Sequence, residues 1–597
     1  MRWAVLGTLL ALAGACGWVA WRAYEFSAAY PAANRSIDHL RSLSAVESAS
    51  TSIDRLTLAR ADLQELKDSL QQLDDATALP IGEPIARQLI WIGPRYAAVR
   101  DLVRMGQLSV DAGTLVTQIG EDLLRTLDTT DVNQPPGVTP SWLDAISPYG
   151  PQLVSVVDDI RTIQAVRARI DDRVLPARVR TRLGEIDRIL ESSQVQALMS
   201  MDLAATEAAL GETAPARYLV VFQNPAELRP TGGFPGTMAL LTLDHGKLVA
   251  YEFFDAHELT DVYLAHRQTV LPQPWPIERF FPQTGFLLHD SLWWPDFPRS
   301  AKQLMAMYAE TGWPTIAGVV AVQPEVASTL VGVTGPFTVD FQGQQRRVTA
   351  DNLYSEIERQ RVQTIEKPED LLVHKEMLGL IGKSLIERLK NADRNALMRA
   401  GQQLAVACRR RDVQVYVSDP VVETELDRQQ CTGRLLPVDG QPTLAVAFAN
   451  LALSKTSMAM QPRLTLTTGA PQDGQRPATL NIDVQDLAAA EEDPVYAGFQ
   501  RWWVEITLPE GSSLLSERGP MDDPGAPNGG SYVAELFPGM SGRISVRFSM
   551  PDEPSLLIRR QPGLRTAEVS VSVTSCEHVL DTQLDEDVLV DVRGVCA

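Results

Sequence analysis

Residues 224–237 combine glycines and a cation at a spacing that could bind a phosphate. Their sequence is Asn-Pro-Ala-Glu-Leu-Arg-Pro-Thr-Gly-Gly-Phe-Pro-Gly-Thr. Gly232 and Gly233 would let backbone amides approach a ligand, and Arg229 would supply positive charge. The segment lacks the Gly-Lys-Ser/Thr of a Walker loop and the glycine spacing of a dinucleotide-binding fingerprint. The alternative is a rigid structural connection in which Glu227 pairs with Arg229.

A second candidate segment, His289-Asp-Ser-Leu-Trp-Trp-Pro-Asp-Phe-Pro-Arg-Ser300, stands directly before an expected helix. Asp290 and Asp296 could hold a divalent cation such as Mg²⁺, because carboxylate oxygens are its usual protein ligands. Trp293 could line the path of an apolar ligand. The alternative is that Asp296 or Ser300 caps the helix and the tryptophans belong to a core.

Two further charged residues are candidates by position. Asp255 follows an expected strand that ends at Phe254, so the chain could bring its carboxylate to the same sheet edge. Lys375 lies between Leu371 and Leu378 on the apolar stripe of a helix predicted over residues 369–391. A lysine there either extends to solvent or faces an internal anionic site. No spacing supports a nucleophile elbow or a Ser/His/Asp triad.

These residues require an α/β framework to position them. Apolar runs predict strands at 218–222, 237–243, 247–253, 315–322, 413–417 and 444–448. Helices are predicted from Pro298 through Tyr308, from Pro324 through Leu330, after an N-cap at Thr349, and over residues 369–391. Because strands alternate with helices, we expect an α/β head over residues 213–457.

The regions on either side of this head have different patterns. Leucines and other apolar residues recur at steps of three and four between residues 56 and 190. This spacing predicts an antiparallel helical bundle, a stalk over residues 26–212. From residue 458 to 597, apolar and polar residues alternate and turn residues separate the runs, as in Val504, Ile506 and Leu508. That pattern predicts a β-sandwich of immunoglobulin-like type.

The N-terminus suggests the cell compartment. No charged side chain occurs from Trp3 to Trp21, close to the ~20 residues that a helix needs to cross a bilayer. We expect a transmembrane helix over residues 1–25, hence a single-pass cell-membrane protein whose bulk is extracytoplasmic. A cleaved signal peptide is the alternative, and Cys16 leaves lipidation open.

Composition and cysteine content agree with export. The 597-residue chain has a net charge of −21, whereas a nucleic-acid binder needs a basic surface, so we expect no nucleic-acid partner. Beyond Cys16, four cysteines fall into two sequence-local pairs, which suits disulfides in an oxidising compartment. The alternative is four buried thiols. No spacing of zinc ligands occurs.

The segment Asn-Pro-Ala-Glu-Leu-Arg-Pro-Thr-Gly-Gly-Phe resembles the signature of the bacterial family named domain of unknown function 4012. Further matches to that family's pattern are residues 290–297, Thr349-Ala-Asp-Asn352, and Asn450 with Lys455. The resemblance covers residues 216 to 457. The family's activity is unknown, so the likeness adds little about mechanism.

The order of elements is also similar to that of LytR-CpsA-Psr proteins, which transfer glycopolymers from a polyprenyl-pyrophosphate carrier to the cell wall. Residues 232–238 and 315–334 are similar to their strand-turn-strand and strand-helix units. However, Phe234-Pro235-Gly236 replaces the arginine and aspartate of their turn, and no Arg-x-x-Arg-Gln stands before Met377. Asp255 is similar in place to the aspartate of their Pro-Arg-Asp segment, but Phe254 replaces its arginine. The resemblance therefore implies a shared fold with altered or lost catalysis.

Together these observations give two hypotheses. In the first, the head binds, and transfers, a polyprenyl-phosphate-linked envelope glycopolymer, with Mg²⁺ as a cofactor. The catalytic candidates are Arg229, Asp255 and Asp290; the ligand-binding candidates are Gly232, Gly233, Thr237, Trp293 and Lys375; the metal candidates are Asp290 and Asp296. In the second, the protein is a non-enzymatic surface scaffold or adhesion protein with an inactive head. The bundle's heptad seams leave homo-oligomerisation open.

Overall fold

The computed structural model divides into two compact units, Met1–Leu203 and Ala204–Ala597, which we describe separately. It describes residues 52–78, 93–128, 149–191, 207–281, 283–357, 373–392, 394–436, 440–488, 497–517, 528–564, 567–573 and 576–592. The expected membrane anchor at residues 1–25 lies outside these ranges. Within them, no helix combines the length and the apolarity needed to span a bilayer.

The first unit is a bundle of helices, as predicted. Helix α2 (Ser52–Thr77) lies against α4 (Gly93–Asp128), and α4 lies against α6 (Gly150–Arg167); η2 (Asp172–Val174) and α7 (Ala177–Leu190) follow. The α2–α4 contact pairs two heptad rows. A Cβ placed on Gly106, Gly113 or Gly120 would lie 3.0–3.3 Å from Leu70, Leu63 and Leu56, respectively. The glycines therefore let two antiparallel helices approach closely.

The second unit contains a five-stranded mixed sheet, ordered β3-β2-β1-β4-β7. Its strands are β1 (Ala216–Asn224), β2 (Phe234–Asp244), β3 (Lys247–Asp255), β4 (Gly318–Val322) and β7 (Val413–Val417). Strands β1 and β4 pair in parallel, and the other pairings are antiparallel. The β2–β3 hairpin turns at His245 and Gly246, both with positive φ, as its Asp-His-Gly sequence predicted.

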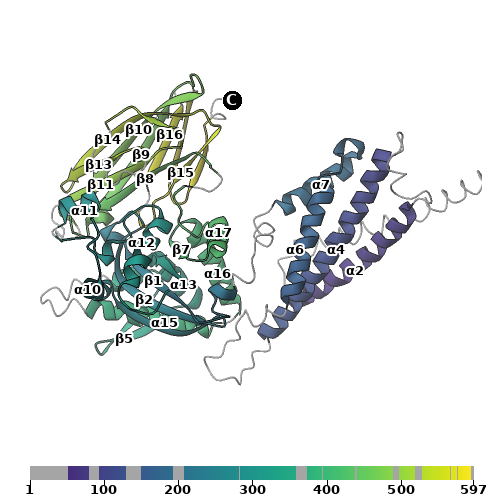
Figure 1. The fold of residues 1–597 in the computed structure, drawn as a ribbon, viewed down its shortest axis with the longest axis horizontal. Coiled ribbons are helices and arrows are strands. Elements are labelled where there is room, and N and C mark those ends of the chain that lie inside the picture. Colours follow the sequence, from purple (N-terminus) through teal and green to yellow (C-terminus); the bar gives the residue numbers. More distant parts are fainter. Residues whose placement is uncertain are drawn as a thin grey trace, which may run out of the picture. The chain divides into compact units, whose positions relative to one another are not determined.

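Helices cover both faces of this sheet (Figure 1). One face, with Leu219 and Val319, packs against α10 (Ala256–His266), α11 (Trp275–Phe280), η4 (Leu288–Asp290) and α12 (Phe297–Ala309). On the other face lie α13 (Pro324–Thr334), α15 (Val373–Lys390), α16 (Arg394–Arg409) and the hairpin of β5 (Phe337–Phe341) and β6 (Gln344–Val348). Alternate strand residues thus supply two separate cores.

Residues beyond the head form two packed sheets, a β-sandwich, as predicted (Figure 1). One sheet has the order β12-β14-β10-β9-β16-β17, and the other has the order β13-β11-β8-β15-β18. Their inner faces share one large apolar core that includes Phe448, Trp502 and Phe548. Both sheets are mixed, because β8 pairs in parallel with β15 and β9 pairs in parallel with β16. We expected a sandwich of immunoglobulin-like type, whose sheets are antiparallel, and these two parallel pairings depart from it.

One strand assignment was wrong. We expected residues 444–448 in the head, but β8 (Thr443–Asn450) lies in the second sheet of the sandwich, between β11 and β15. All eight of its residues are buried, so its sequence has no alternation that distinguishes the two environments. The remaining elements are η3 (Pro225–Glu227), α17 (Pro420–Arg428), η6 (Thr456–Ala459), β9 (Met460–Thr468), β10 (Gln475–Asp486), β11 (Gln500–Thr507), β12 (Ser513–Leu514), β13 (Ser531–Leu536), β14 (Ser541–Pro551), β15 (Ser555–Arg559), β16 (Glu568–Val573), β17 (Cys576–Gln583) and β18 (Val588–Asp591).

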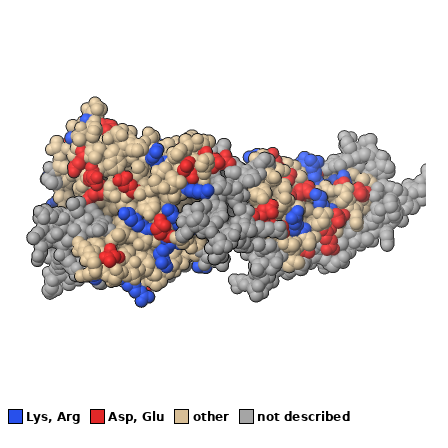
Figure 2. All heavy atoms as spheres, turned by 90° about the horizontal axis from the view of Figure 1, so that it is seen from below, with Lys and Arg blue, Asp and Glu red and all other residues tan. Residues whose placement is uncertain are grey.

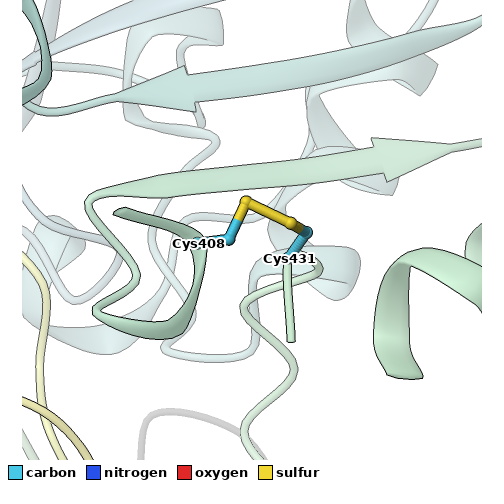
Figure 3. Close-up of a disulfide and its surroundings, with 2 residues drawn as sticks. All are labelled: Cys408 and Cys431. Atoms are coloured by element: carbon cyan, nitrogen blue, oxygen red, sulfur yellow. A yellow bond between two sulfur atoms is a disulfide. The ribbon is translucent and has the colours of Figure 1, made fainter. Parts of the chain in front are cut away.

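A disulfide joins Cys408, in the last turn of α16, to Cys431, after α17 (Figure 3). This is one of the two pairs that we expected. Of the other pair, Cys576 begins β17, but its side chain and Cys596 lie outside the described residues.

Candidate functional site

The loop between β1 and β2 is buried where the head meets the sandwich. Asn224 starts it by accepting a hydrogen bond from the Ala226 amide at 3.1 Å, which caps η3. The Leu228 amide donates to Ser457 Oγ at 3.0 Å, and the Leu228 carbonyl accepts from the Asn450 amide at 2.9 Å. Backbone groups of the loop are thus satisfied by residues more than 200 positions away.

Arg229 is directed into this junction and is only 6% exposed. Its Nη1 donates to the Asn450 carbonyl at 2.9 Å, and its guanidinium lies over the rings of Phe234 and Phe281 at 5.6 and 5.2 Å. Burial lowers the pKa of Arg229, while the charges of Asp290 and Glu227 act in the opposite direction. We expected Arg229 to contact a phosphate; the described contacts give it a structural role.

The paired glycines are required by close packing. A Cβ on Gly232 would collide with Nε2 of Gln323, and one on Gly233 would collide with the backbone of Asn224. Gly232 also has φ 126°, a conformation that side chains disfavour. Neither glycine lines a described pocket. The small size and the backbone flexibility of these two glycines are needed for the tight turn of the loop rather than for an open ligand site.

A chain of buried amides lies beneath the loop. Gln323 Nε2 donates to Gln223 Oε1 at 2.7 Å, and Gln223 Nε2 donates to Thr231 Oγ1 at 2.8 Å. Thr231 Oγ1 in turn donates to the Leu292 carbonyl at 3.0 Å, and Gln414 Nε2 donates to the Thr231 carbonyl at 2.7 Å. The chain connects the ends of β1 and β4 with the loop. Gln323 Oε1 is buried and has no hydrogen-bond partner among the described residues.

Histidines and carboxylates gather around Phe234. The rings of His257 and His289 lie 4.7 Å apart, and each is within 5.8 Å of the Phe234 ring. Asp255 caps α10 by accepting from the His257 amide at 2.8 Å. Asp290, 3% exposed, accepts from Gln283 Nε2 at 2.5 Å, with His289 Nε2 3.7 Å away.

Burial lowers the pKa of His289 to about 4, so its ring is neutral at pH 7. The Thr260 hydroxyl has one hydrogen, which it donates to the Ala256 carbonyl at 2.8 Å. His289 Nδ1 lies 3.0 Å from that same oxygen and is therefore the donor in their pair. Asp290 thus lies close enough to Arg229 for its negative charge to raise the pKa of that guanidinium. Asp255 lies beside the ring of His257.

The described contacts of Asp290 and Asp296, the two residues expected for Mg²⁺, do not join them to each other. Asp296 Oδ2 accepts from the Arg299 amide at 3.2 Å, and Oδ1 accepts from the Leu435 amide at 2.8 Å, so Asp296 is a helix cap. Among the described residues, no group of three or more His, Cys, Asp or Glu side chains could hold a metal ion. Trp293 is fully buried in the head core, as our structural alternative had it.

An apolar pocket of about 120 Å³ lies on the opposite face of the sheet. Its walls come from the ends of β1, β2 and β4 and from α13 and α15, with apolar side chains at Phe222, Val322, Ala327, Leu378, Ile381 and Leu385. Polar groups border it at Gln223, Asn224, Thr237, Gln323, Tyr354 and Lys455. Thr237 is therefore the one predicted ligand-binding residue in this lining.

Lys455 was not among our predicted site residues. It is 6% exposed and pairs with Glu227 Oε1 at 3.6 Å, so Glu227 does not form the ion pair with Arg229 that we considered. A family-pattern match at Lys455 was the signal available in the sequence. Lys375 lies in the first turn of α15, whose later residues line the pocket, but its side chain lies outside the described residues.

On the face drawn in Figure 2, acidic and basic side chains of the described residues are interspersed among uncharged ones.

A comparison with curated proteins finds none that matches the chain. Residues 213–361 match the model of the family described as Protein of unknown function (DUF4012), which supports that family for this part of the chain.

Proposed function

We propose that the head binds an apolar chain ending in a phosphate, the chemistry of a polyprenyl-phosphate carrier of an envelope glycopolymer. The observation that carries the proposal is the pocket beneath α15, whose lining is mostly apolar and also contains polar groups such as Gln323 and Lys455. An isoprenoid tail would fill the space between Phe222, Ile381 and Leu385. The likeness to LytR-CpsA-Psr proteins suggests the same ligand class.

The phosphate would lie at the polar border of the pocket. Lys455 lies there and would exchange its ion pair with Glu227 for the phosphate, and the N-terminus of α13, at Pro324, supplies the positive end of a helix dipole. Gln323 Oε1 is an acceptor without a described partner, and a protonated phosphate oxygen of the ligand would donate to it. These groups replace Arg229 in the role that we first assigned to it.

We propose binding rather than transfer as the activity of the head. A transferase must stabilise the charge of a leaving pyrophosphate with cations that are free to reach it. Arg229 is occupied by the Asn450 carbonyl, and Asp296 caps a helix. The apolar run from Trp3 to Trp21 would hold the head near a membrane, where a polyprenyl tail is available.

The test is binding of geranyl phosphate and geraniol to the full-length protein, measured by calorimetry. Ala327→Phe fills the pocket and should abolish binding of both compounds, whereas Thr329→Phe, on the exposed side of the same helix, should leave both unchanged. Lys455→Met should weaken geranyl phosphate but not geraniol. Absence of geranyl phosphate binding, or equal binding by the Ala327→Phe protein, would refute the proposal.

One observation favours the second hypothesis, a non-enzymatic scaffold. The cation of the signature loop, Arg229, is buried and bonded to backbone carbonyls of the head–sandwich junction. The most distinctive motif of the sequence therefore has a structural role at this junction. If the lipid experiment fails in both arms, this is the function that remains.

A further inference from the structure

A hollow of about 550 Å³ opens at the junction of the head and the sandwich, away from the apolar pocket. Five arginines line it: Arg409, Arg411, Arg428, Arg434 and Arg559. Three carboxylates, Asp427, Glu586 and Asp587, share that lining, and Glu425 and Glu423 pair with Arg428 and Arg434 from outside it. The whole chain has a net charge of −21, so this concentration of arginine runs against its composition.

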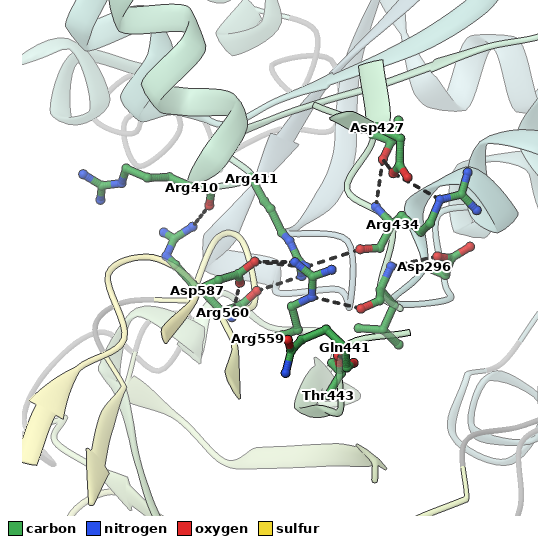
Figure 4. Close-up of polar contacts among 12 residues, drawn as sticks. Asp296, Arg410, Arg411, Asp427, Arg434, Gln441, Thr443, Arg559, Arg560 and Asp587 are labelled. Carbon is green, nitrogen blue, oxygen red and sulfur yellow. Dashed lines mark hydrogen bonds and ion pairs between the residues drawn. The ribbon is translucent and has the colours of Figure 1, made fainter. Parts of the chain in front are cut away.

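Two of the arginines are held in place by one carboxylate. Asp587 Oδ2 lies 2.5 Å from Arg559 Nη1 and 3.4 Å from Arg411 Nη2 (Figure 4). The Arg560 amide also donates to Asp587 Oδ1 at 2.8 Å. Arg411 further donates to the carbonyls of Arg560 and Arg434 at 3.1 and 3.3 Å. The single negative charge of Asp587 therefore balances only one of the two positive charges of Arg411 and Arg559.

The other arginines are more open to solvent. Arg434 Nε donates to Asp427 Oδ1 at 3.1 Å, and Arg428 pairs with Glu425 at 3.2 Å. Arg409 is exposed and has no partner among the described residues. Burial lowers the pKa of Arg411 to about 10, which still leaves its guanidinium charged at pH 7. The hollow thus presents two guanidinium groups held by Asp587 and a third, on Arg409, whose donors are not used by the described residues.

The disulfide fixes the two segments that carry most of these arginines. Cys408 directly precedes Arg409, and Cys431 stands between Gln430 and Thr432, both of which line the hollow. Figure 3 shows this link between the end of α16 and the segment after α17. A covalent tie at this place limits how far the two backbone segments can separate.

We propose that the hollow is a binding site for a phosphorylated saccharide. Guanidinium groups bind phosphate oxygens in a bidentate manner, and several are oriented here in advance. The hollow is much larger than a phosphate, and Gln430, Gln441 and Thr432 offer amide and hydroxyl groups to sugar hydroxyls. The inference uses no residue of the apolar pocket, so it stands without the proposed lipid binding.

The test is calorimetry on the full-length protein with glucose 1-phosphate, inorganic phosphate and glucose at constant ionic strength. We expect glucose 1-phosphate to bind more tightly than inorganic phosphate, and glucose not to bind. Arg409→Gln should weaken glucose 1-phosphate by about tenfold, the loss expected for one charge-assisted contact. The matched control is Arg547→Gln, an exposed arginine on β14, which should change nothing.

A second variant separates this site from the lipid pocket. Ala327→Phe should leave sugar-phosphate binding intact, because Ala327 lines the apolar pocket. The double change Cys408→Ser and Cys431→Ser should weaken sugar-phosphate binding in a protein that circular dichroism shows to be folded. The proposal is overturned if glucose 1-phosphate does not bind, if inorganic phosphate binds equally well, or if Arg409→Gln and Arg547→Gln have the same effect.

Discussion

Gly563, in the sandwich, lies directly against the backbone of Gly232 in the loop between β1 and β2. A Cβ on Gly563 would collide with the Gly232 carbonyl oxygen, and φ of Gly563 is 71°. Nearby, Gln561 Nε2 donates to the carbonyls of Arg229 and Phe448 at 3.1 and 2.8 Å. The head and the sandwich therefore meet through backbone contacts that tolerate no side chain at this point.

Replacing Gly563 by alanine should destabilise the second unit. The new methyl group would force Gly232 away, and the left-handed φ would add about 1 kcal/mol of strain. We expect a lower midpoint of urea unfolding and a total loss of roughly 2–4 kcal/mol. The control is Gly539→Ala, also at positive φ but with open space around its Cβ, which should lose only the strain. Equal losses in the two proteins would contradict the close contact.

Arg229 should matter for stability rather than for lipid binding. Arg229→Met removes the donor to the Asn450 carbonyl and the cation over the rings of Phe234 and Phe281. Leaving a buried acceptor without its charged donor costs about 1–3 kcal/mol. Chemical denaturation should show this loss, while geranyl phosphate affinity of the folded fraction stays unchanged. A stable variant that no longer binds the lipid would restore Arg229 to a binding role.

His289 should make the protein less stable in mild acid. Its pKa is lowered by burial from 6.5 to about 4 in the folded state, so between these values the unfolded chain binds more protons. The contribution of neutral His289 to the free energy of unfolding is therefore fully present above pH 6.5 and is lost as the pH falls toward 4. The expected loss is roughly 3 kcal/mol between pH 7 and 4. His289→Asn, which cannot titrate, should show a flatter pH profile of unfolding free energy; identical slopes would disprove the assignment.

The glycine row on α4 should control helix packing in the first unit. A Cβ on Gly113 already lies 3.3 Å from Leu63, so Gly113→Leu would push α2 and α4 apart. We expect the free energy of unfolding of the bundle to fall by about 2 kcal/mol or more. A lower midpoint of thermal unfolding would show this loss. Gly184→Leu, on α7 with nothing within 4 Å of its Cβ, is the control. If both variants unfold alike, the seam does not set the helix spacing.

Local patterns predicted most elements of the head, because they depend on neighbours in sequence. The hairpin at Asp244-His245-Gly246 and the N-cap at Asp296 follow from turn and cap chemistry. Strand β8 was misplaced because Thr443–Asn450 is apolar on both faces and carries no sign of its partners. The local pattern therefore predicted the strand but not the sheet to which it belongs.

The site was less predictable, because its residues meet only in three dimensions. Arg229 binds a carbonyl 221 positions away, and Arg411 meets Asp587 after 176 positions. A lone arginine has no local feature that marks it as part of a cluster. Gly232, in contrast, stands at a close approach, as its type indicated. The groups that approach it belong to the chain itself rather than to a ligand.

The interlocked loop also bears on how this protein could evolve or be dissected. The family match ends at residue 361, before α15, β7, Asn450 and Gln561. A fragment limited to the matched region would lose an edge strand of its sheet, the acceptor of Arg229 and the roof of the apolar pocket. The boundary of sequence similarity is therefore not a boundary of autonomous folding. An experiment on the head would therefore need a protein that also includes the sandwich.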